Sequence, residues 1–212
     1  MNRRWWLLSN TTYGTWLPGA DRGFVGHVRE HRPDDDLDDA RVNHGMPGTP
    51  YDKKMPGLWR KAEKLMKGPP IHLGPDHAEQ ALEQFKETSR HRGWQLAALS
   101  IMHNHFHIVV GVEDDPEPGK VLGDFKSWGT RRLSRVFGEP ESKTWWTSCG
   151  SKRELADLEA VSIAARYTLF KQPNPLVAWS PKLGKNPEHD PTATRASGPA
   201  GGGPVRRPPD AG

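Results

Sequence analysis

Residues 101–110 read IMHNHFHIVV, and the chain around this stretch alternates between apolar runs and a short polar turn. Residues 94–102 and 106–112 are rich in apolar and β-branched side chains, as β-strands usually are. The polar pair His103 and Asn104 separates the two runs. This stretch therefore predicts two strands joined by a turn.

The elements on either side complete an α+β pattern. We expect strands at residues 5–8 and 144–147, and helices at residues 58–66, 76–92, 119–137 and 152–172, with Asp76 as the N-cap of the second helix. The order of strands and helices predicts a ferredoxin-like (RRM-like) fold: an antiparallel sheet with helices on one face. A further helix then carries Tyr167.

Two segments are too polar or too rich in turn residues to belong to a packed core. Residues 18–56 contain many Pro, Gly and Asp residues, with an acidic cluster at 34–39, and are predicted to form a long loop. Residues 184–212 are dominated by Pro, Gly and Ala, which predicts a disordered tail. The remaining sequence, residues 1–183 with the long loop inside it, is predicted to be one domain.

Composition limits the classes of function. No apolar run reaches the roughly 18 residues that a membrane span requires, and the single cysteine, Cys149, rules out an internal disulfide and a cysteine-based zinc site. The net charge of +4 permits a nucleic-acid partner, and the nine tryptophans include possible stacking platforms for unpaired bases. We expect a soluble cytoplasmic protein with no membrane partner.

His105 and His107 are the first candidate site residues. Side chains two residues apart on a strand point to the same face, so the two imidazoles would lie side by side while Phe106 points into the core. Two histidines are too few for a closed zinc site, but they suit an open catalytic site for Mg²⁺ or Mn²⁺ completed by oxygen ligands. The alternative is a pair of surface histidines without a metal. His103 alternates onto the same face but lies in the turn.

Tyr167 is the candidate nucleophile among the three tyrosines of the chain. On a helical wheel the predicted buried stripe of the last helix contains Leu155, Leu158, Ser162, Ala165 and Leu169. Tyr167 lies roughly 160° from the centre of that stripe, so it is not on the main buried face. The alternative is an ordinary half-buried aromatic residue. About one turn further on, Gln172 and Asn174 offer amide oxygens to a metal.

Together these features resemble a known family. The strand MHNHFHIVV (102–110) is similar to the MPNHVHLLL-like strand of the single-tyrosine HUH transposases, and YTLFKQPNPLV (167–177) is similar to their YIxxNPV-like helix. The opening NTTYGTWLPGADRGFVG and the segment GSKREL point to the branch of REP-associated tyrosine transposases. The resemblance covers roughly residues 5–177.

The resemblance implies a reaction. Tyr167 would attack a phosphodiester of single-stranded DNA, forming a 5′-phosphotyrosine and releasing a 3′-hydroxyl, with assistance from a divalent metal (Mg²⁺ or Mn²⁺). His105, His107 and Gln172 would hold the metal, with Asn174 as the alternative ligand, because Lys171 stands where the family has an amide.

The resemblance also implies partners. The protein would bind single-stranded or hairpin DNA at the nucleoid, as a monomer or a homodimer. Four cations of helix 119–137 would contact phosphates, although the same residues are equally typical of a solvated helix face: Lys126, Arg131, Arg132 and Arg135.

Two other functions compete with this interpretation. A domesticated DNA-hairpin-binding protein of the same fold would bind DNA without cutting it, and the displaced amide near Tyr167 favours that alternative. The His-Asn-His sequence at 103–105 also suggests a metal-dependent hydrolase. That class needs a ββα metal fold, whereas this chain continues directly into a strand.

Overall fold

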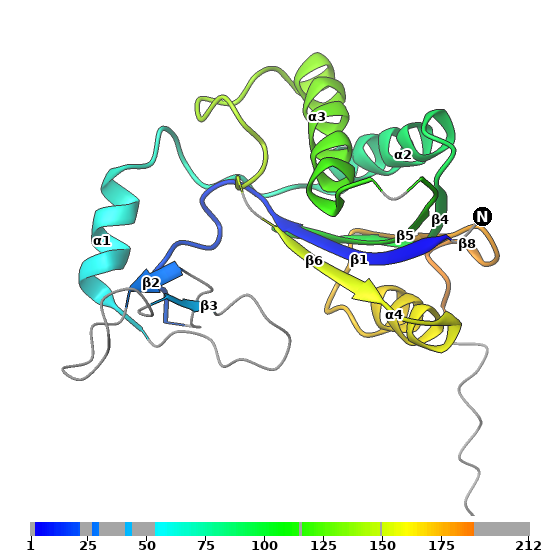
Figure 1. Ribbon diagram of the computed structural model, residues 1–212. Helices are drawn as coiled ribbons and strands as arrows, with labels where there is room; N and C mark the ends of the chain where they lie inside the picture. Colours follow the sequence, from blue (N-terminus) through cyan, green and yellow to red (C-terminus); the bar gives the residue numbers. More distant parts are fainter. Residues whose placement is uncertain are drawn as a thin grey trace, which may run out of the picture.

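The computed structural model describes residues 3–21, 27–29, 41–43, 54–114, 116–148 and 150–188. These residues form a six-stranded sheet in the order β6-β1-β5-β4-β7-β8, in which every neighbouring pair is antiparallel (Figure 1). The strands are β1 (Arg4–Thr11), β4 (Gln95–Ile101), β5 (His105–Val112), β6 (Ser151–Leu155), β7 (Val177–Ser180) and β8 (Gly184–Lys185). The first four strands in the chain order β1, β4, β5, β6 have the ferredoxin-like arrangement, which confirms the predicted α+β class.

Helices cover both faces of this sheet. Helices α2 (Pro75–His91) and α3 (Pro118–Phe137) lie side by side on one face, as predicted, and α4 (Leu158–Phe170) lies on the opposite face (Figure 1). Helix α1 (Pro56–Lys64) precedes them, close to the predicted range 58–66. The sheet therefore separates the helix that carries Tyr167 from the two earlier helices.

The larger core lies between the sheet and the α2–α3 layer. Its bulkiest members are fully or almost fully buried aromatic side chains: Phe85, Phe106, Phe125 and Trp146. Phe85 is in ring contact with the other three, at centroid distances of 5.1 to 6.3 Å. A smaller cluster, built largely from alanine and valine, fills the space between the sheet and α4.

The predicted N-cap of the second helix, Asp76, was two residues too late. Helix α2 begins at Pro75, and Gly74 is its N-cap with an extended backbone. Proline at the first helical position costs no hydrogen bond, because that N–H has no partner within the helix, and its fixed φ suits the helix. Asp76 therefore lies inside the first turn, where its carboxylate interacts favourably with the helix dipole.

The predictions for residues 144–172 were partly wrong. Trp146 forms only an isolated bridge with Thr12, and the fourth strand of the sheet is Ser151–Leu155, which pairs with β1. This strand is exposed at four of its five residues, so its polar sequence gave no strand pattern. Pairing with β1 and the Arg4–Glu154 ion pair (2.9 Å) override the helix-forming character of the residues.

Helix α4 is shorter than predicted and buries a different stripe. It begins at Leu158, because the Asp157 side chain accepts a hydrogen bond from the Ala160 N–H (2.7 Å), and it ends at Phe170. Its buried residues are Val161, Ala164, Thr168 and Leu169. Leu169 is buried as predicted, but Leu155 lies in β6 and Leu158 is 74% exposed, so most of the leucine-based stripe was wrong.

The two segments predicted to be irregular are only partly described. Within 18–56, residues His27–Arg29 (β2) and Arg41–Asn43 (β3) pair as a small antiparallel ribbon, and much of the rest lies outside the described residues. Order continues past the predicted tail boundary at Gly184, because β8 pairs with β7 and Asn186 bonds Ala178 through both backbone and side chain. Residues 189–212 and Cys149 lie outside the described residues. In the part that is described, no helix has the length and apolar character that crossing a membrane requires.

Candidate active site

His105 and His107 lie side by side on β5, on the face of the sheet that α4 covers. Their ring centroids are 5.0 Å apart and the rings are nearly perpendicular. Phe106, between them, points to the opposite face and packs against Phe85 and Trp146. The alternation of the strand thus presents two half-buried imidazoles on one face and anchors them through a fully buried phenyl ring on the other.

Each imidazole is oriented by a hydrogen bond at its Nδ1 atom. His105 Nδ1 lies 2.6 Å from Asn104 Oδ1, and His107 Nδ1 lies 2.5 Å from Ser9 Oγ, which is its cross-strand neighbour on β1. An amide oxygen only accepts hydrogen bonds, so His105 carries its proton on Nδ1 and its lone pair on Nε2. Such a hydrogen bond is the usual way in which proteins fix a histidine for metal binding through the other nitrogen.

Tyr167 reaches the histidine pair from α4. Its ring centroid lies 5.6 Å from that of His107, with the two rings steeply inclined. The tyrosine side chain is 44% exposed, so a macromolecule can reach its hydroxyl. Helix α4 packs on β4 and β5 through the buried residues Val161 and Ala164, and this packing leaves Tyr167 at the edge of the contact.

Gln172 is the amide that the structure brings to this site. Its side chain hydrogen-bonds to His107, and its Nε2 donates to the Tyr167 carbonyl oxygen (3.3 Å). Asn174 is exposed and adopts a positive φ of 46°, and within the described residues it makes no hydrogen bond to either imidazole. Lys171 caps the helix and is exposed. Of the two amides that the sequence offered, only Gln172 therefore lies beside the histidines.

Burial keeps His107 neutral. The pKa of His107 is lowered from 6.5 to about 4: burial is the largest cause, the neighbouring His105 also lowers it, and the hydrogen bond to Gln172 opposes the shift. A neutral imidazole is the form that binds a metal, so this environment prepares His107 as a ligand at neutral pH.

The donor set is compatible with an open divalent-metal site. Two imidazoles and one amide oxygen leave positions for water and for a phosphate oxygen. No cluster of three or more His, Cys, Asp or Glu residues suited to a metal is present among the residues that the structure describes. A closed structural site is therefore not formed by these residues. His103 lies apart from the pair and stacks on His72, at a centroid distance of 5.6 Å.

The four predicted DNA-contacting cations lie on α3, on the other side of the sheet, and they do not form one surface. Lys126 Nζ donates to the carbonyls of Thr147 (2.5 Å) and Ser148 (2.9 Å). Arg132 Nε donates to Gln80 Oε1 of α2 (2.8 Å). Both residues therefore support the fold. Arg131 lies over the exposed Trp128 ring (4.4 Å), and Arg135 is exposed near the end of the helix.

Sequence reasoning missed the two residues that orient the histidines. Asn104 was visible within the motif as the residue preceding His105. Ser9 is 98 residues away from His107 and directly follows the first predicted strand, residues 5–8, so no signal in the sequence connected it with the histidines. Neither residue bears a charge or a spacing that marks it as functional.

Comparison with known proteins gives a family match and likenesses to solved structures. Residues 72–151 match the family model described as IS200-like transposase. A solved structure described as the REP-associated tyrosine transposase bound to a REP hairpin aligns with 79% of this chain and 66% of its own, at 9% identity and a TM-score of 0.40. No curated protein matches the chain significantly. The matched segment contains α2, β4, β5 and α3, and it ends before the tyrosine helix.

Proposed function

We propose, from the match of residues 72–151 to the family model described as IS200-like transposase, that this chain cleaves and rejoins single-stranded DNA with Tyr167 as its nucleophile. The observation that carries the proposal is the ring contact between Tyr167 and His107, at 5.6 Å, on the face that also holds His105. Because the family match ends at residue 151, the role of Tyr167 rests on this geometry and not on the match.

The reaction transfers one phosphoryl group. The Tyr167 phenol oxygen attacks the scissile phosphorus and loses its proton, while the bond from phosphorus to the 3′-oxygen breaks. The products are a 5′-phosphotyrosine and a strand that ends in a 3′-hydroxyl. The number of phosphodiester bonds is conserved, so a second 3′-hydroxyl can attack the phosphotyrosine and join DNA without an external energy source.

His105, His107 and Gln172 would hold a divalent metal, Mg²⁺ or Mn²⁺, beside the nucleophile. When bound, such an ion polarises a phosphate oxygen and offsets the negative charge that develops on the reacting group. The contribution of the chain itself is orientation. Asn104 and Ser9 fix the two rings, and Gln172 joins the last turn of the tyrosine helix to His107.

Arg131 and Arg135 are the cations of α3 that we propose for contacts to DNA phosphates. Both are exposed, whereas Lys126 and Arg132 are held by hydrogen bonds within the protein. Since α3 and α4 cover opposite faces of the sheet, a DNA that reaches both extends beyond the cleavage site (Figure 1).

Covalent trapping tests the proposal. Purified protein is incubated with Mn²⁺ and single-stranded oligonucleotides from the DNA that flanks its own gene, and the products are separated on a denaturing gel. We expect an adduct that EDTA, Tyr167→Phe and His105→Ala each abolish. The matched control is Tyr13→Phe, since the Tyr13 hydroxyl is engaged by a hydrogen bond from the Lys67 N–H.

The other outcomes are equally informative. An adduct that persists in Tyr167→Phe would show that another residue is the nucleophile. Hairpin binding that needs no metal and survives Tyr167→Phe, without any adduct, would favour the alternative of a DNA-hairpin-binding protein that has lost cleavage activity.

A further inference from the structure

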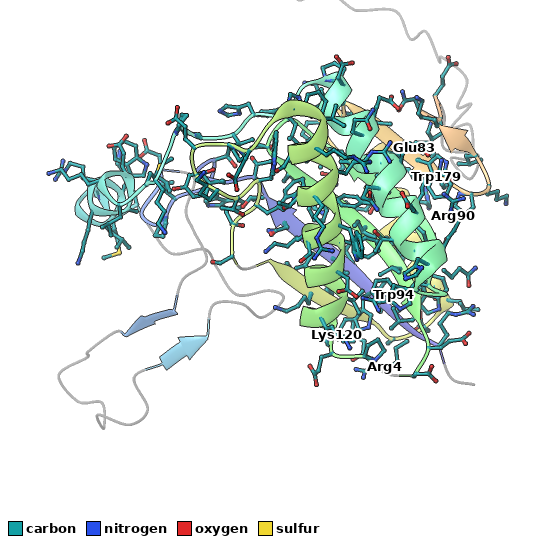
Figure 2. The ribbon with its side chains drawn as sticks, turned by 90° about the horizontal axis from the view of Figure 1, so that it is seen from above. Arg4, Glu83, Arg90, Trp94, Lys120 and Trp179 are labelled. Atoms are coloured by element: carbon teal, nitrogen blue, oxygen red, sulfur yellow. The ribbon has the colours of Figure 1, made fainter. Side chains whose placement is uncertain are left out.

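A concave surface lies on the α2 side of the sheet, on the face opposite to the helix that carries Tyr167. It is a groove of about 350 Å³, which we call the tryptophan groove, and it is lined by Glu83, Lys86, Ser89, Arg90, Trp94, Leu96 and Trp179. Figure 2 shows Glu83, Arg90, Trp94 and Trp179 gathered beside α2. The groove is thus lined by α2, by the start of β4 and by β7, and these two strands are far apart in sequence.

The two tryptophans are each half-buried. The inner side of Trp94 packs on Phe125, at a centroid distance of 5.5 Å, and Trp179 packs against the same large core. Both side chains also line the groove, so part of each indole is presented to solvent there. Two indoles in one groove form a surface on which flat apolar rings stack, and every nucleobase offers such a ring.

The charges beside the indoles suit a phosphate. Lys86 Nζ lies 5.3 Å from the Trp179 ring and 2.9 Å from Glu83 Oε1, so its cation is held over the groove. Arg90 is exposed one turn further along α2, and no carboxylate of the described residues forms an ion pair with it. The next arginine, Arg92, is paired with Asp124 (2.9 Å) and does not compete for the same ligand.

We propose that the tryptophan groove binds an unpaired segment of DNA, with bases stacked on Trp94 and Trp179 and a phosphate on Arg90. The choice of DNA as the ligand rests on the proposed function. Aromatic grooves also bind proline-rich peptides, but a peptide of that kind makes no use of a cation such as Arg90. Stacking side chains interleaved with cations are the combination that single-stranded nucleic acid requires.

The position of the groove gives it a separate role from cleavage. Helices α2 and α4 pack on opposite faces of the same two strands, β4 and β7, so the groove and Tyr167 lie on opposite sides of this part of the sheet. The groove would hold a part of the substrate that is not being cut. Its loss should therefore weaken binding of DNA with long single-stranded segments more than it slows the attack by Tyr167.

Binding is measured in full-length protein carrying Tyr167→Phe and in EDTA, so that neither cleavage nor a metal contributes. The probe is a fluorescein-labelled 15-nucleotide single strand, followed by fluorescence anisotropy. We expect Trp179→Leu to raise the Kd about tenfold, which is typical of the loss of one stacked base, and Arg90→Glu to raise it about tenfold because a phosphate contact is replaced by charge repulsion. Arg60→Glu, the same charge change at an exposed position of α1, should alter the Kd less than about twofold.

Photo-crosslinking locates the contact directly and does not depend on a variant that folds. A single strand that contains 5-iodouracil is irradiated with the protein, and the crosslinked peptides are identified by mass spectrometry. We expect peptides that contain Trp94 or Trp179. Crosslinks confined to other peptides, or equal losses in Arg90→Glu and Arg60→Glu, would overturn the proposal, as would competition for the groove by a proline-rich peptide but not by DNA.

The two proposals fail in different ways. If the groove variants bind the 15-nucleotide strand as tightly as the parent while the wild-type chain still forms its tyrosine adduct, only the groove proposal is wrong. If no adduct forms but crosslinks map to Trp94 and Trp179, the groove proposal stands and the cleavage proposal fails.

Discussion

The two faces of the central sheet are built from different kinds of residues. The face under α2 and α3 buries large aromatic side chains such as Phe85 and Phe106, whereas the face under α4 is packed mainly with small residues such as Ala98 and Ala164. On the α4 face the polar side chains of the candidate site stay half-buried or exposed. Strand β5 belongs to both faces, because its alternation sends Phe106 one way and the histidines the other. The comparison indicates that one face supplies most of the buried aromatic core and that the other carries the candidate site.

Substitution on the aromatic face should have the largest effect on stability. Phe106→Ala removes a fully buried ring that contacts Phe85 and Trp146, so we expect the free energy of unfolding to fall by about 3–5 kcal/mol. His105→Ala, the adjacent residue on the other face, should lower it by about 1 kcal/mol. Urea denaturation followed by circular dichroism measures both values, and equal losses would break the distinction between the two faces.

The acid sensitivity of the metal-free protein should arise on the histidine face. The pKa of His107 is about 4 in the folded chain and 6.5 when unfolded, so below pH 6.5 the unfolded chain binds a proton that the folded chain does not. This contribution to stability is complete above pH 6.5 and is lost as the pH falls towards 4, at a total cost of about 3 kcal/mol. In EDTA, His107→Gln should therefore lose less stability than the parent between pH 7 and pH 4. The same pH dependence in both proteins would contradict the assignment.

Metal affinity should separate the two amides that follow Tyr167. Gln172→Ala removes a side chain that bonds to His107, so we expect Mn²⁺ to bind at least about tenfold more weakly. Asn174→Ala alters an exposed residue and should leave the Mn²⁺ affinity within about twofold of the parent. Isothermal titration calorimetry measures both. A larger loss in Asn174→Ala would assign the third ligand to that residue instead.

The smallest effects should separate the arginines of α3 from one another. Arg132→Met breaks the hydrogen bond to Gln80 and should lower the free energy of unfolding by about 1 kcal/mol. Arg135→Met should leave stability unchanged, weaken hairpin binding, and reduce the slope of log Kd against log salt by about one. A larger change in DNA affinity in Arg132→Met than in Arg135→Met would reverse these roles.

Strong local patterns in the sequence predicted much of this arrangement. The apolar runs on either side of His103 and Asn104 predicted β4, β5 and the shared face of the two histidines, and the helices expected at residues 76–92 and 119–137 correspond to α2 and α3. These elements have buried faces, and burial leaves a periodic mark on the sequence. The position of Tyr167 away from the buried stripe also agreed with its exposure, although only Leu169 of the predicted leucines in that stripe is buried within α4.

The remaining features depend on contacts between distant parts of the chain. Strand β6 is exposed and polar, so only its pairing with β1 defines it as a strand. The hydrogen bond between Ser9 and His107 depends on the register of β1 against β5. The choice between Gln172 and Asn174 depends on how the chain leaves α4, where Asn174 takes a positive φ and Gln172 folds back on Tyr167. None of these features has a periodic signature.

The central claim is that Tyr167 becomes covalently joined to DNA, and mapping the attachment site tests it most directly. The trapped adduct is digested with nuclease and trypsin, and the peptide that retains a nucleotide is sequenced by mass spectrometry. The account predicts a peptide that contains Tyr167, with the phosphoryl group on the phenol oxygen. A nucleotide attached to a peptide that contains Tyr13 or Tyr51 instead would contradict it.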